Sequence, residues 1–135
     1  MAVLRKMVLF TLGGLGYMGL ELLWRGWSHS SMFLAGGTCF MLLGQLERVR
    51  PRLFWPLRAV LGSIVITSVE LLTGLLVNRS YAVWDYRHLP WNFYGQICLP
   101  FSALWLPVSL GAMALHLHLD RLLKRHFHKN SSVEK

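Results

Sequence analysis

The chain has 135 residues, of which 54% are hydrophobic and only 15% are charged. A soluble domain of this length has too little interior to bury so much apolar surface, so the composition favours an integral membrane protein. The formal net charge is +8, from 14 Lys and Arg against 6 Asp and Glu. The basic residues stand in short clusters between apolar runs, which indicates contact with anionic lipid and argues against nucleic acid as a partner.

Four apolar runs predict membrane-spanning helices over about residues 7–24, 31–46, 57–77 and 95–117. A span needs about 20 apolar residues, so the second run is short. In this run Gly36, Phe40 and Gly44 form a row that lets a neighbouring helix approach closely. No small-residue cleavage site follows the first run, so we expect a retained helix and not a signal peptide. The predicted fold class is all-α, an integral membrane four-helix bundle over residues 1–125, with a basic polar tail over 126–135.

The charge clusters predict the orientation of these helices. The N-terminal segment, the loop 47–58 and the tail are rich in Lys and Arg, whereas the first and third loops are poor in them. Because basic loops stay in the cytoplasm, we expect both termini there, and the first and third loops outside. The expected location is the plasma (inner) membrane. Expected partners are membrane lipids and, since four short spans enclose little volume, a second copy or a larger membrane complex.

Glu70 lies inside the third apolar run, where an ionisable group is costly and suggests a function. Helical spacing places Ser63, Thr67, Glu70, Gly74 and Asn78 on one face, which should point into the bundle. Two interpretations of Glu70 stay open. In one, it binds a ligand or a proton or takes part in catalysis; in the other, it only hydrogen-bonds neighbouring groups and holds the helices in register.

The first helix has a matching polar face that includes Glu21 and Arg25. These two residues are four apart, in the favourable order for a helical ion pair, and an interfacial pair would explain both. They also lie near the outer end of their helix, as Glu70 does in the third. Together with His29 of the following loop, they predict a polar pocket that opens to the outside.

The third loop, residues 78–94, is rich in Trp, Tyr and Pro. An aromatic belt at the membrane surface explains its aromatic residues. Its polar residues either cap turns and the fourth helix or line the pocket. The candidate solute- or proton-binding residues are Glu70, Glu21, Arg25, Asn78, Asp85, Asn92 and Gln96. The residues expected to support the pocket or the loop are His29, Gly74, Trp84, Tyr86, Gly95 and Trp105.

The sequence contains no recognisable metal-binding motif, cofactor motif or assignable catalytic residue. The two cysteines are isolated in apolar runs, and His116 and His118 are two residues apart, so they do not share a helix face. Walker A, GxSxG and HExxH patterns are absent from the sequence. An enzyme is therefore less expected than a transport protein.

From Glu70 onward the sequence carries a specific pattern. It consists of E-x-x-x-G at 70–74, W-D-Y at 84–86 and P-W-N-x-x-G-Q-I-C-L-P-F-S-x-x-W at 90–105. This pattern resembles the small membrane proteins called putative ABC-transporter type IV, or CmpB-like. The resemblance covers about the second half of the chain and implies a multi-span, permease-type protein. The first half lacks the family's Gly-Pro and Pro-Ile-Tyr-Gly motifs and reads RGWSHSSMFLAGG there. The residues that carry over are Glu70, Gly74, Trp84, Asp85, Tyr86, Asn92, Gly95, Gln96 and Trp105.

The leading functional hypothesis is a small permease or transporter-like protein that binds a polar solute or a proton in an outward-facing pocket around Glu70. One alternative is an intramembrane enzyme acting on a lipid or lipid-linked substrate, since paired carboxylates with Arg and His can perform acid–base chemistry. The other is a structural or accessory subunit without a ligand.

Overall fold

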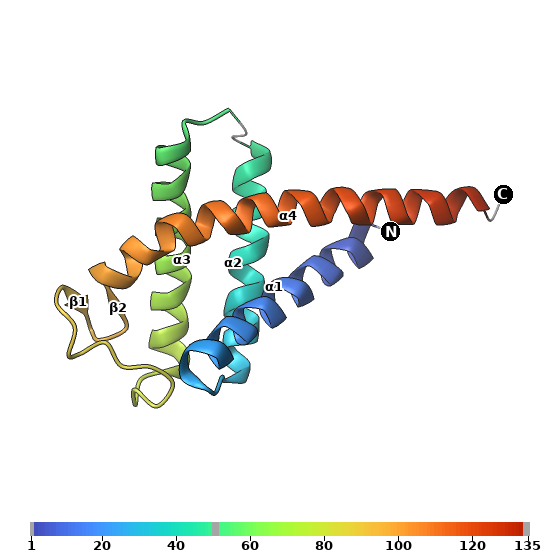
Figure 1. Cartoon of the computed structure of the whole chain (residues 1–135). Helices are drawn as coiled ribbons and strands as arrows, with labels where there is room; N and C mark the ends of the chain where they lie inside the picture. The colour runs from blue at the N-terminus through green and yellow to red at the C-terminus, as the bar shows by residue number, and fades with distance from the viewer. Residues whose placement is uncertain (1, 50–51, 134–135) are drawn as a thin grey trace.

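The computed structural model describes residues 2–49 and 52–133, without the side chains of Trp24 and Arg25. Within this part the chain forms four helices, α1 (Ala2–Arg25), α2 (Ser30–Val49), α3 (Trp55–Val77) and α4 (Leu99–Val133). Helices α2 and α3 lie side by side and run in opposite directions, and α4 crosses both (Figure 1). The predicted fold class was all-α, and the described chain is indeed mostly helical.

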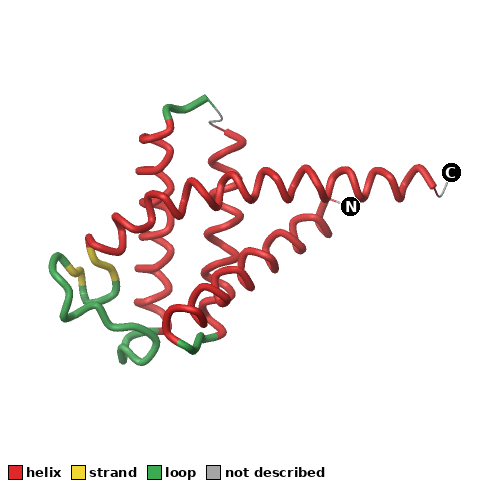
Figure 2. Tube along the Cα trace, viewed as in Figure 1, coloured by secondary structure: helices red, strands yellow, loops and turns green. Residues whose placement is uncertain are grey.

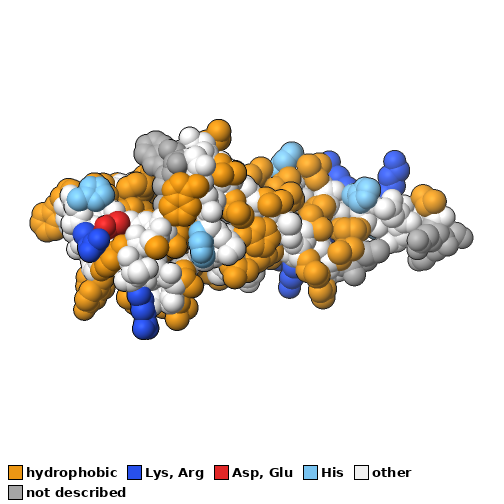
Figure 3. Space-filling view, turned by 90° about the horizontal axis from the view of Figure 1, so that it is seen from below, with side chains coloured by type: hydrophobic (Ala, Val, Ile, Leu, Met, Phe, Trp, Pro, Cys, Tyr) orange, Lys and Arg blue, Asp and Glu red, His pale blue; other side chains and the backbone are white. Residues whose placement is uncertain are grey.

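Three of the helices are long and apolar enough to cross a membrane, over Ala2–Leu23, Trp55–Val77 and Leu99–Val133 of the described residues. Helix α2, which contacts all three other helices, falls outside this set. Hydrophobic side chains spread over the face of the molecule seen in Figure 3. Its helices thus have the length and composition of a membrane protein. The number of four spans and the cytoplasmic location of both termini remain predictions.

The fourth helix differs from its expected bounds at both ends. It begins at Leu99, not near residue 95, because the preceding residues form a short antiparallel hairpin of β1 (Asn92–Phe93) and β2 (Ile97–Cys98) (Figure 2). It then continues to Val133, through most of the segment expected as a tail. At about 1.5 Å per residue α4 is about 50 Å long, so it exceeds a hydrocarbon core of about 30 Å.

Glycines bring α2 close to α1 and α4, as their spacing predicts. A Cβ on Gly36 would lie 2.5 Å from the Cβ of Tyr17 in α1, and a Cβ on Gly44 would overlap the His116 ring of α4. Phe40, between these glycines, meets the same His116 ring edge-on with the ring centroids 5.0 Å apart. Close packing at α2 therefore depends on the absence of side chains at two positions.

The variant Gly44→Ala is expected to lower the free energy of unfolding by about 1–3 kcal/mol, because the added methyl group overlaps a buried ring. Thermal unfolding of the purified protein in detergent measures the change. Gly19→Ala is the matched control, since a Cβ there meets nothing within 4 Å. Equal stability of the two variants would contradict the close approach of α4 to α2.

Candidate functional site

Glu70 lies on the face of α3 that points toward α4 and the loop 78–98, and it is 8% exposed. Its carboxylate accepts a hydrogen bond from the Tyr86 hydroxyl at 2.7 Å and another from Trp105 Nε1 at 3.3 Å. Burial raises the pKa of the Tyr86 phenol far above its ordinary value, so Tyr86 keeps its proton and acts as the donor. Both donors are neutral, and no described cation forms an ion pair with Glu70. The carboxylate therefore has unused acceptor capacity.

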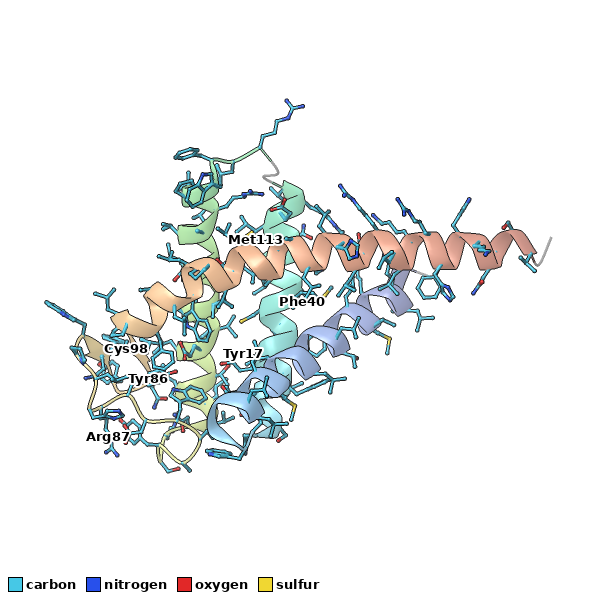
Figure 4. The ribbon with its side chains drawn as sticks, in the orientation of Figure 1. Tyr17, Phe40, Tyr86, Arg87, Cys98 and Met113 are labelled. Carbon is cyan, nitrogen blue, oxygen red and sulfur yellow. The ribbon has the colours of Figure 1, made fainter. Side chains whose placement is uncertain are left out.

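Glu70 also forms part of the wall of a cavity of about 380 Å³, bounded by all four helices and by Trp84 of the loop. We call this space the central cavity. Tyr17 and Phe40 enter its wall from α1 and α2 (Figure 4). Glu70 is the only charged side chain among the described lining residues. The apolar part of the wall includes Leu12, Leu20, Met32, Leu43, Ile66, Val69, Trp105, Val108, Leu115 and Leu119. The space beside Glu70 is thus far more apolar than the polar pocket expected from the sequence.

The other polar residues on this face of α3 point inward, as predicted, and hold α3 to α4. The Ser63 hydroxyl donates a hydrogen bond of 2.6 Å to the carbonyl oxygen of Ser102. Thr67 Oγ1 and the Ser102 hydroxyl are hydrogen-bonded at 2.9 Å. Gly74 leaves room for the side chain of Gln96, which a Cβ at this position would overlap. These residues hold α3 to α4 or to the loop, whereas Glu70 both bonds Trp105 of α4 and borders the central cavity.

Asn78 and Gln96 fasten the loop to the end of α3. Asn78 is fully buried; its side-chain oxygen accepts from the backbone N–H of Val83 at 2.9 Å and of Trp84 at 3.2 Å. Its amide nitrogen donates to the Trp84 carbonyl at 2.7 Å and to Gln96 Oε1 at 2.9 Å. The Gln96 amide donates back to the Asn78 carbonyl at 3.0 Å, and Trp84 Nε1 donates to the Gln96 carbonyl at 2.9 Å. Both amides are therefore occupied within the loop.

Asp85 and Asn92 lie on the outer part of the loop and do not line the central cavity. Asp85 pairs with Arg87 at 2.8 Å, and Arg87 stands at the edge of the molecule (Figure 4). The hydrogen bond from Arg87 lowers the pKa of Asp85 to about 2. Asn92 donates to the Leu89 carbonyl at 2.9 Å and accepts from the Gly95 N–H at 3.2 Å, so it caps the hairpin turn and not the fourth helix. Gly95 has φ of +65°, which favours glycine at this position.

The candidate residues of the first helix are placed only in part. Glu21 is half-buried and lies near enough to Glu70 for the two charges to interact. The Arg25 side chain falls outside the described residues, and the expected Glu21–Arg25 pair falls outside with it. His29 caps the start of α2, where its Nδ1 accepts from the Ser31 N–H at 3.1 Å, and it is not part of the cavity wall.

A second polar cluster, around Asp120 of α4, was not predicted. Asp120 is buried and forms ion pairs with Arg5 Nε at 2.9 Å, Arg48 NH2 at 3.2 Å and Lys124 Nζ at 3.2 Å. It thus joins the start of α1, the end of α2 and the basic half of α4. The available signal was that Asp120 is the only acidic residue in the α4 sequence and stands four residues before Lys124. The cluster brings together one residue from each of the three basic segments.

In the part of the chain that the structure describes, no group of three or more His, Cys, Asp or Glu side chains is arranged to hold a metal ion. No curated protein and no solved structure matches the chain. The family model described as Putative ABC-transporter type IV matches residues 8–132, which include nearly all of the four helices. The match extends the resemblance from the second half of the sequence to the first. The chain therefore belongs to the putative ABC-transporter type IV family, and it is a transporter-related membrane protein.

Proposed function

We propose that the protein is a permease-like membrane protein whose central cavity takes up a proton or a largely apolar solute with one cationic group, held at Glu70. The observation that carries the proposal is the single carboxylate in an apolar wall, with two neutral donors and no ion pair among the described residues. A carboxylate away from water is costly unless it gains a proton or meets a cation. A bound proton or cation removes this cost.

The apolar cavity wall restricts the class of solute more closely than the sequence does, which predicts only a polar solute. A solute that is polar all round would lose its hydration against leucine, isoleucine and phenylalanine side chains without gaining partners. An apolar body with one charged end matches both parts of the wall. The volume of about 380 Å³ suits a small molecule, since such sites measure about 300–1,000 Å³. One chain thus supplies a whole cavity, and the homodimer or larger complex expected from the sequence stays a prediction.

The loop 78–98 is placed to respond to what Glu70 binds. Trp84 forms part of the cavity wall, and Tyr86 reaches Glu70 from the same loop. A cation at Glu70 reduces the negative charge with which the carboxylate holds the Tyr86 hydroxyl, so occupation of the site weakens one attachment of the loop. In the predicted orientation this loop lies on the outer side, which supports an opening toward the outside.

The test compares wild type with Glu70→Gln in lipid nanodiscs, using decyltrimethylammonium and decanol as matched probes. Trp84 and Trp105 line the cavity, so tryptophan emission reports binding. We expect the variant to bind the ammonium about 10–100-fold more weakly, the loss of one charge-assisted contact, and to bind decanol as before. Asp85→Asn is the control because its carboxylate lies outside the cavity.

The proton form of the proposal has its own measurement. Vesicles that contain the protein and a pH-sensitive dye should acidify faster than empty vesicles under an inward proton gradient, and Glu70→Gln should abolish the difference. If neither ammonium binding nor proton flux depends on Glu70, the proposal is wrong.

A structural or accessory role is the second candidate. It is favoured by the hydrogen bonds of Ser63, Thr67, Asn78 and Gln96, all of which hold the loop or α4 to α3. This role predicts that Glu70→Gln changes the folding yield and no binding property. The lipid-enzyme hypothesis gains no support from the geometry, since His29 caps α2 and does not face Glu70 across the cavity.

A further inference from the structure

A second cavity, distinct from the central one, lies between the end of α2, the start of α3 and the middle of α4. Its volume is about 410 Å³, and we call it the basic-end cavity. Its polar lining consists of Arg58, His118, Arg121 and Glu47. None of these residues lines the central cavity. The basic-end cavity therefore has a chemistry of its own.

The positive charge in this cavity exceeds the negative charge. One guanidinium nitrogen of Arg58 donates to both carboxylate oxygens of Glu47, at 2.9 and 2.7 Å, while Arg58 Nε is buried with no hydrogen-bond partner among the described residues. Within the same part of the chain, no ion pair engages Arg121. One carboxylate thus faces two guanidinium groups, and donors of both remain available for an anion.

The start of α3 adds to the positive potential. Helix α3 has no side-chain cap and no acidic residue in its first turn, and its first-turn residues Trp55 and Arg58 line the cavity. Pro56 has no N–H and the Arg58 N–H donates to the Phe54 carbonyl at 3.0 Å, so this terminus contributes mainly the positive end of the helix dipole, which favours an anion. Guanidinium groups are the donors that phosphate groups prefer, and the helix dipole adds to their positive potential.

The rest of the wall is apolar, which distinguishes the expected occupant from a free ion. Leu110, Met113 and Leu117 of α4 line the cavity beside the cationic groups, and Trp55 is 61% exposed at its edge. A free phosphate ion gains nothing from an apolar wall. In a phospholipid, the phosphate matches the cationic groups of the cavity and the acyl chains match its apolar residues. Basic pockets between helices at the positively charged membrane side suit anionic head groups.

We propose that the basic-end cavity binds the phosphate of an anionic phospholipid, with Arg121 and Arg58 holding the head group and the apolar face of α4 contacting the acyl chains. The lipid joins α3 to α4 at the end of the molecule opposite the loop 78–98. The site does not involve Glu70, so the proposal stands or falls independently of transport through the central cavity.

Native mass spectrometry of the full chain in lipid-free detergent tests the site. Phosphatidylglycerol and phosphatidylcholine are the two lipid probes, and Arg121→Gln is the variant because Arg121 holds no ion pair that folding requires. We expect wild type to bind phosphatidylglycerol about tenfold more tightly than phosphatidylcholine and Arg121→Gln to lose this preference. Arg125→Gln, one turn further along α4 and outside the cavity, is the matched control and should keep it.

Three results would overturn the proposal. Equal affinity of wild type for the two lipids removes the anionic head group as the ligand. If Arg121→Gln and Arg125→Gln lose the preference for phosphatidylglycerol equally, the attraction is a diffuse one to a basic helix and there is no defined site. Displacement of phosphatidylglycerol by inorganic phosphate at similar concentration identifies a free-phosphate site.

Discussion

Replacing Asn78 with alanine is expected to lower the free energy of unfolding by about 4 kcal/mol, because four buried polar groups lose a partner at about 1 kcal/mol or more each. These groups are the N–H of Val83, the N–H and carbonyl of Trp84, and Gln96 Oε1. All of them belong to the loop that covers the central cavity. Unfolding in detergent, followed by circular dichroism, measures the change.

Asn92→Ala is the control for this variant. Asn92 makes similar side-chain hydrogen bonds in the same loop but is exposed, so water replaces the lost partners. We expect Asn92→Ala to cost less than about 1 kcal/mol. Limited proteolysis should cut the loop in Asn78→Ala and leave it intact in Asn92→Ala. Equal protection of the loop in both variants would show that Asn78 does not hold it.

Asp120→Asn is expected to lower the free energy of unfolding by about 3 kcal/mol, since removal of a buried carboxylate leaves its cationic partners facing each other. The Asp120 side chain is 4% exposed and that of Arg5 is 18% exposed. Arg48 and Lys124 are about half exposed, so solvent weakens their share of the interaction. Arg5 therefore carries most of the expected effect.

A double-mutant cycle with Arg5→Gln measures that share. If Arg5 and Asp120 interact directly, the double variant should lose less unfolding free energy than the two single variants lose together, by about 1–3 kcal/mol. Strict additivity would mean that the start of α1 is held to α4 by other contacts. The same unfolding measurement as for Asn78→Ala serves for all three proteins.

The elements that the sequence predicts best are those whose signal is local. Apolar runs locate both ends of α2 and α3 to within a few residues, and helical spacing alone predicts that Ser63, Glu70 and Asn78 face the interior. The spacing of Gly36 and Gly44 likewise predicts that neighbouring helices approach closely there. Each of these signals lies within one helix, so no knowledge of a partner is needed to read it.

The contacts of the candidate site could not be predicted from signals within single helices. Asn78 and Gln96 were candidates for binding a solute or a proton, and the structure shows that they bond each other across 18 positions of sequence. The hairpin at 92–98 moves the start of the fourth helix to Leu99, because Asn92 and Cys98 pair across a turn, and the apolar runs of the sequence do not reveal this pairing. Whether a polar residue meets a ligand or another residue depends on distant parts of the chain.

By itself the sequence determined that this protein is helical and apolar enough for a membrane, that it belongs with a transporter-related family, and that Glu70 faces inward. Only the tertiary structure decided that the wall around Glu70 is apolar, that Asp120 joins three basic segments, and that Arg58 and Arg121 share a second cavity. The physical reason is the range of the interactions. Hydrophobic periodicity acts within one helix, whereas cavities and buried ion pairs form between residues far apart in the chain.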